Sequence, residues 1–187
     1  NSQGFEMIYP AMIGGSDDEM AGNGPFPWVL FFGSDGEAKD GYMDLTSEIV
    51  KRGYIVLVTQ EMQDSNDLSE GLEIAQTAFE VMNDTNNSHT IILGGFGNVD
   101  VNHWALAGHG VGAMTATSLY PNWLASDNGD TTHGPSGLFA VGADFSSWNQ
   151  QYGTFSTMDW QAPAPNTGLF ITGTTDEGAP VQDAITK

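Results

Sequence analysis

Five apolar runs, each ended by glycine or by polar residues, dominate the pattern of the chain. They are residues 28–32, 54–58, 104–107, 137–142 and 169–172. Runs of this length without polar alternation are typical of strands that are buried on both faces of a parallel sheet. We therefore predict five core strands, and a short edge strand at residues 5–9.

Amphipathic patterns separate these runs. Residues 40–52 and 67–82 place apolar side chains on one side of a helix, and residues 113–119 continue as a third helix after the run at 104–107. Residues 122–135 are polar and predict a loop. Alternating strands and helices with short joints indicate parallel βαβ units, so the predicted fold is α/β, with a mostly parallel, doubly wound sheet and helices on both faces.

Length and composition predict one domain. The chain has 187 residues, 40% of them hydrophobic, which is enough to bury a core and excludes a disordered acidic chain. Residues 1–25 hold the predicted edge strand and an acidic, glycine-rich loop, and residues 26–187 hold the core. The sequence contains neither an internal repeat nor a linker, so we expect a single domain over residues 1–187.

The charge balance restricts the partners. There are 24 acidic residues against 4 Lys and Arg, a net charge of -20. This excludes nucleic acid as a partner, because phosphate binding needs clustered cations, and it disfavours an anionic membrane surface. The acidity is explained either by solubility in a marine or high-salt setting or by a cation-binding surface. Because the acidic residues are scattered rather than grouped at ligand spacing, the first explanation is favoured and no metal site is predicted.

The chain contains no cysteine, so disulfides and thiolate metal sites are excluded. No apolar run reaches the length of a membrane span. The first residue is Asn1 rather than methionine, which suggests a processed chain. We expect a protein that is secreted or that lies in an organelle lumen.

The turn at residues 108–112 carries the candidate chemistry. The apolar run at 104–107 breaks at Gly108, and a helical run begins after Gly112. The sequence of this turn, Gly-His-Gly-Val-Gly, matches the nucleophile elbow G-x-S-x-G, in which flanking glycines let a sharp strand-to-helix turn expose a serine. Gly110 stands at the serine position. The pattern therefore predicts an elbow without a nucleophile.

Five segments in the same order resemble the α/β-hydrolase superfamily, specifically its group of dienelactone hydrolases, cutinase-like polyester hydrolases and chlorophyllases. They are residues 27–36, 45–60, 100–112, 137–145 and 169–180. The resemblance implies the α/β-hydrolase fold and an ester hydrolase that uses a Ser, Asp, His triad in that chain order and no cofactor. The sequence stops short of the family's last strand and covering helix, so we expect a C-terminally short sheet with an open edge near residues 169–172.

The resemblance also assigns positions in the site. Gly110 holds the nucleophile position and Asp176 the position of the triad acid. No histidine follows Asp176, so the triad histidine position is absent from this sequence. The backbone N–H groups of Ser34, Asp35 and Val111 hold the oxyanion positions, and the Asp35 carboxylate would oppose a developing oxyanion.

Gly110 has three interpretations. A lost nucleophile is favoured because His109 and both flanking glycines are in register with the motif; a turn that never held a serine and an engineered or altered residue are the others. Glycine also relieves the backbone strain of an elbow, so the fold can survive the loss.

Asp176 would then act as a turn cap. His109 has no second ligand at metal spacing, and the glycine spacing does not fit a dinucleotide-binding loop.

An aromatic segment at residues 145–160 supplies the candidate binding residues. The resemblance places Phe145 where relatives carry an aromatic side chain that packs on substrate, and Trp148 would line the same cleft. These aromatic side chains would serve equally well as an interface with a partner protein.

We therefore expect a degenerate, non-catalytic α/β-hydrolase-fold protein with a binding or structural role. Its partners would be a small ester or hydrophobic ligand, or a protein at residues 145–160 or at the open sheet edge. The first alternative is a serine ester hydrolase, of the carboxylesterase, polyesterase or chlorophyllase type, whose sequence here is incomplete or altered. The second alternative is a subunit of a larger extracellular or organellar assembly.

Overall fold

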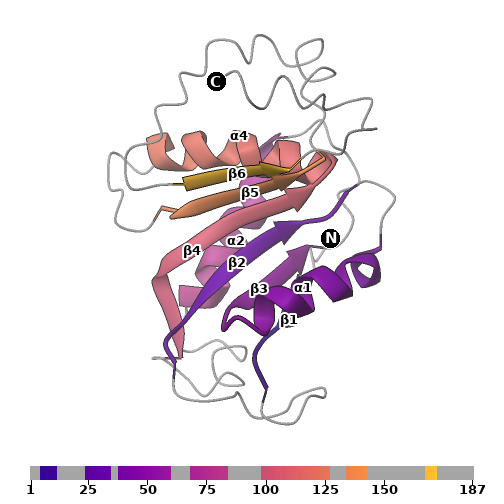
Figure 1. Ribbon diagram of the computed structural model, residues 1–187. Helices are drawn as coiled ribbons and strands as arrows, with labels where there is room; N and C mark the ends of the chain where they lie inside the picture. Colours follow the sequence, from indigo (N-terminus) through magenta and orange to yellow (C-terminus); the bar gives the residue numbers. More distant parts are fainter. Residues whose placement is uncertain are drawn as a thin grey trace.

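The computed structural model describes residues 5–11, 24–34, 38–59, 68–83, 98–126, 134–142 and 167–171. Within these ranges a six-stranded sheet has the order β1-β3-β2-β4-β5-β6 (Figure 1). The strands are β1 Phe5–Ile8, β2 Phe26–Phe32, β3 Ile55–Thr59, β4 Val99–His109, β5 Gly137–Val141 and β6 Thr167–Ile171. The helices are the 3-10 helix η1 Lys39–Tyr42 and the α-helices α1 Met43–Val50, α2 Leu68–Asn83 and α4 Val111–Ser126.

Strands β3, β2, β4, β5 and β6 are parallel, and β1 pairs with β3 in the antiparallel direction. Helix α1 covers one face of this sheet, while α2 and α4 cover the other (Figure 1). The predicted doubly wound α/β fold is therefore confirmed. Because the carboxyl ends of parallel strands meet at one edge, the ends of β2, β3 and β4 lie together there, with residues 33–34 and Gly110 directly after β2 and β4.

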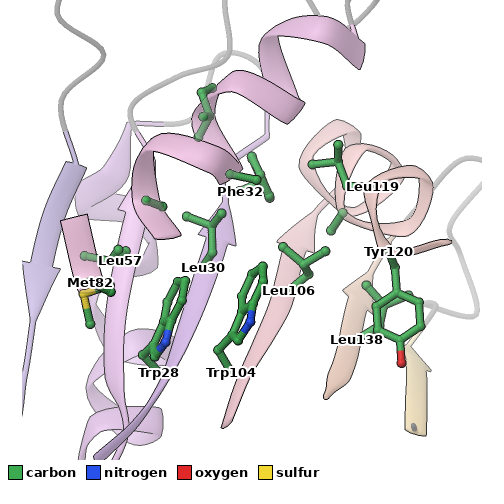
Figure 2. Close-up of a cluster of buried hydrophobic side chains, with 14 of the residues drawn as sticks. Trp28, Leu30, Phe32, Leu57, Met82, Trp104, Leu106, Leu119, Tyr120 and Leu138 are labelled. Atoms are coloured by element: carbon green, nitrogen blue, oxygen red, sulfur yellow. The ribbon is translucent and has the colours of Figure 1, made fainter. Parts of the chain in front are cut away.

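The central strands are buried on both faces, as their apolar runs predict. On β2, Trp28 and Leu30 point to the cluster under α2 and α4, whereas Val29 and Phe31 point to the cluster under α1. Figure 2 shows Trp28 beside Trp104 of β4, and their rings stack with centroids 4.6 Å apart. Such alternation gives the sheet two cores, which fix its position between the helices.

Two element boundaries differ from the prediction by more than two residues. The backbone of α4 stays helical to Ser126, although the polar sequence from residue 122 predicts a loop. Leu119 and Tyr120, in the turn before this extension, are buried against the sheet, and this packing outweighs local composition. Strand β4 begins at Val99 rather than at residue 104, because its first half is a more exposed extension whose polar residues hide the strand pattern.

No helix in the described ranges is both long enough and apolar enough to cross a membrane.

Candidate active site

Gly110 forms the whole turn between β4, which ends at His109, and α4, which begins at Val111. Its φ of +53° lies in the left-handed region that favours glycine. The N–H of Gly110 donates to the Val141 carbonyl of β5 at 2.8 Å, and its own carbonyl accepts the Met114 N–H at 3.2 Å. One residue therefore turns the chain from strand to helix, which is the backbone geometry of a nucleophile elbow.

The flanking glycines allow the close approach of strand and helix. A Cβ atom on Gly108 would overlap the backbone of Gly112 and would lie 2.6 Å from the Ala113 nitrogen. A Cβ atom on Gly112 would overlap the Phe32 carbonyl oxygen and would lie 2.5 Å from the Gly33 carbonyl oxygen. Both glycines are therefore required by packing, and the end of β2 is pressed against the first turn of α4.

Ser34 lies over the nucleophile position. An ideal Cβ atom on Gly110 would stand 2.5 Å from the Ser34 hydroxyl oxygen and 3.3 Å from the Ser34 Cβ atom. Apart from the immediate chain neighbours, no other residue in the described part of the chain places an atom within 4 Å of that position. The space in which a serine side chain would begin is therefore next to a hydroxyl group from the turn after β2.

A short polar network fixes this turn. The Ser34 N–H donates to the Tyr42 hydroxyl at 2.7 Å, and the Tyr42 hydroxyl oxygen lies 3.3 Å from His109 Nδ1. The Tyr42 side chain is buried, with 8% of its surface exposed. The Gly33 N–H points to the Thr59 hydroxyl at the end of β3, 3.4 Å away. These contacts tie the turn after β2 to η1, to β3 and to the elbow itself.

The structure brings three predicted site residues together, namely Gly110, Ser34 and Val111. Val111 begins α4, where the first backbone N–H groups of a helix have no acceptor within the helix. The Ser34 N–H, which the resemblance assigns to an oxyanion hole, already donates to Tyr42. The other predicted site residues lie outside the described part of the chain: Asp35, Phe145, Trp148 and Asp176. The predicted interface at residues 145–160 lies outside it as well.

Tyr42 belongs to the site, although the sequence pattern predicts only a core residue at this position. Its position on the apolar side of the helical pattern at residues 40–52 indicates a core residue, and its ring does pack on Phe31 with centroids 4.9 Å apart. Its hydroxyl group is the feature that could have indicated a polar role, because a buried tyrosine hydroxyl needs a hydrogen-bond partner. Here the partners come from both sides of the elbow.

The chemistry of this site is limited by what stands at position 110. Glycine offers no side-chain oxygen, so residue 110 itself has no group that can attack a carbonyl. Among the described residues, no group of three or more His, Cys, Asp and Glu side chains is arranged to hold a metal ion. The Asp100–His103 pair, 2.8 Å apart, lies in the first half of β4, well before the elbow.

Comparison with known proteins gives a fold and no sequence family. Models of known protein families do not match the sequence, and neither do curated protein sequences. Solved structures do match. A candidate α/β hydrolase of unknown function from Agrobacterium tumefaciens has a TM-score of 0.58 at 16% identity, over 96% of this chain and 70% of that one.

Two esterase structures match as well. An esterase from the fungus Rhizomucor miehei has a TM-score of 0.51 at 16% identity, and a bacterial heroin esterase has 0.50 at 14%. The matches cover 77% and 75% of this chain, but only 45% and 44% of the two esterases. The chain therefore has the α/β-hydrolase fold and spans less than half the length of these two relatives.

Proposed function

We propose that the chain is an α/β-hydrolase-fold protein whose elbow no longer catalyses and which acts by binding or as a scaffold. The observation that carries this proposal is Gly110, which has the left-handed backbone of the elbow and no side chain. The Ser34 hydroxyl beside the nucleophile position and the occupied Ser34 N–H support it further. A small ester or a hydrophobic molecule is the ligand class for which such a fold is suited.

The size of the expected loss follows from serine hydrolases in general. Removing the nucleophilic serine from such an enzyme lowers its turnover on the order of a million-fold, and the activity that remains comes from oxyanion stabilisation and binding. At this elbow the Ser34 N–H is engaged by Tyr42, so that remaining contribution is reduced too. We expect ester turnover indistinguishable from a protein-free blank.

The test is hydrolysis of p-nitrophenyl acetate and butyrate by the purified chain. Gly110→Ala serves as the matched control, because alanine introduces a side chain at the elbow but no oxygen. Equal rates for the chain, the control and the blank are expected. Turnover of about 1 per second or more by the chain as given, a value ordinary for enzymes, would contradict the proposal.

Ester hydrolysis by a form with serine at position 110 is the second candidate function. Its support is the intact backbone of the elbow, with both flanking glycines packed as the motif requires. The likeness to esterase structures favours the same chemistry as the origin of this fold. Hydrolysis gained by Gly110→Ser over Gly110→Ala, either alone or together with Ser34→Ala, would support this second function. Equal inactivity of the two variants in both backgrounds would count against it.

A further inference from the structure

The Ser34 side chain, in the turn after β2, lies in the space that a side chain at position 110 would need. The Ser34 hydroxyl oxygen lies 2.5 Å from where a Cβ atom of residue 110 would be, which is closer than non-bonded atoms approach. The Ser34 Cβ atom lies 3.3 Å from the same point, a tight contact that a shift of a few tenths of an ångström relieves. Relief would therefore come mainly from removing or rotating the hydroxyl group of Ser34.

The backbone of this turn has little freedom to retreat. Its Gly33 carbonyl is packed against Gly112 of α4, where even one added carbon atom would overlap. On the other side, the Ser34 N–H is held by the buried Tyr42 hydroxyl. Tyr42 in turn is 3.3 Å from the nitrogen of His109, the residue just before Gly110. Helix α4 and η1 thus confine the turn to its place above the elbow.

We propose that Ser34 is a blocking residue and Tyr42 the positioning residue that holds it there. Position 110 then accepts a side chain only after the Ser34 hydroxyl group is removed or rotates away from it. This inference rests on the proposed function, because it explains how an elbow without its nucleophile is filled from within the chain. It also predicts that the fold accommodates Gly110→Ser better together with Ser34→Ala than alone.

The experiment is a double-mutant cycle on stability, since folding free energy reports the contact whether or not the protein catalyses. Gly110→Ala, Ser34→Ala and the double variant are unfolded in urea beside the wild-type chain. Residues in contact show energetic coupling. We therefore expect the factor by which Gly110→Ala lowers the folding equilibrium constant to be about ten times smaller in the Ser34→Ala background than in the wild-type background. Gly110→Ser, combined in the same way, should show the same sign.

A matched control separates blocking from backbone strain. Gly53 also has a positive φ, +87°, but an added Cβ atom would meet nothing within 4 Å in the described ranges. Gly53→Ala therefore imposes the left-handed strain without the contact, and it should be additive with Ser34→Ala, to within about twofold in the equilibrium constant.

Two further variants define the roles. Ser34→Gly removes the Cβ atom as well as the hydroxyl group, so the penalty of Gly110→Ala should be largest in the wild-type background, smaller with Ser34→Ala and smallest with Ser34→Gly. Tyr42→Phe removes the hydroxyl that holds the Ser34 N–H, so it should give part of the relief that Ser34→Ala gives. Loss of folding by Gly110→Ser only when Ser34 is intact would also support the inference.

The results that overturn it are additive effects, within about twofold, in the Gly110 cycles, or equal coupling in the Gly53 control. These outcomes are independent of the proposed function. Ester turnover by the wild-type chain would refute the proposed function and leave the coupling to be judged on stability alone. If the stability cycles show no coupling and the wild-type chain hydrolyses no ester, the blocking role of Ser34 is refuted and the proposed function is not.

Discussion

Gly112→Ala is the perturbation that tests the packing of the elbow most severely. The added Cβ atom would lie 2.5 Å from the Gly33 carbonyl oxygen and closer still to that of Phe32. A carbon and a carbonyl oxygen normally stay about 3.3 Å apart, so α4 must move from the end of β2 by about 0.8 Å or more. Both opposing atoms are backbone, which cannot rotate away as a side chain can.

The energetic cost can be bounded from both sides. Overpacking of a well-packed core costs typically about 1–3 kcal/mol, and contact with two backbone oxygens places Gly112 at the upper end. Replacing glycine by alanine in a helix returns at most about 1 kcal/mol. We therefore expect a net loss of about 2 kcal/mol. For a chain of 187 residues this lowers Tm by about 4–8 °C.

Gly71→Ala in α2 is the matched control. Its Cβ atom would lie 2.6 Å from a methyl group of Thr115 on α4, which is side chain rather than backbone. Thr115 is buried and branched at Cβ, so its methyl group yields only in part, and we expect a net loss of about 1 kcal/mol, smaller than at Gly112 because no backbone atom has to move. Urea unfolding of both variants and of the wild-type chain measures the difference. If Gly112→Ala is as stable as the wild-type chain, or if the two variants lose equal stability, the end of β2 does not pack as tightly against α4 as described.

Three other perturbations test separate parts of the structure. Tyr42→Phe leaves the Ser34 N–H without its acceptor and should cost about 1–3 kcal/mol in urea unfolding; an unchanged midpoint would refute the hydrogen bond. Hydrogen bonds from Lys51 and then Arg52 hold the pKa of Glu48 below its ordinary value of 4.5, so Glu48→Gln should lower Tm at neutral pH, and the difference should fade as the pH falls below 4.5. A difference that grows in acid would contradict that ion pair. With a net charge of -20, Tm should rise as NaCl increases from about 0.01 to 1 M, because salt screens self-repulsion, and a fall would show that charge repulsion does not limit stability.

The sequence predicts the sheet well because a strand that is buried on both faces is a continuous run of apolar residues. Strands β2 and β3 consist almost wholly of apolar residues, and both are covered by helices on two sides. The glycines at 108 and 112 likewise predict the tight elbow, since close approach of backbones excludes larger residues. Local patterns suffice where a single physical constraint decides the residue type.

The polar network at the elbow could not be predicted in this way. Tyr42 is 8 residues from Ser34 and 67 from His109, and the fold alone brings the three together. Its ring serves the core while its hydroxyl serves the site, so an apolar pattern describes only half of its role. The position of the Ser34 hydroxyl above Gly110 depends on the path of one turn, which composition does not encode.

The central claim is that this elbow holds no nucleophile, and covalent labelling tests it most directly. A fluorophosphonate probe forms a phosphonate ester with the oxygen of an activated serine and releases fluoride and the hydroxyl proton, and peptide mass mapping then identifies the modified residue. For the wild-type chain we predict no labelling above the level of a urea-unfolded sample, including at Ser34. Stoichiometric labelling of the native chain at Ser34, or at any other serine, would show that an active nucleophile exists and would contradict the account.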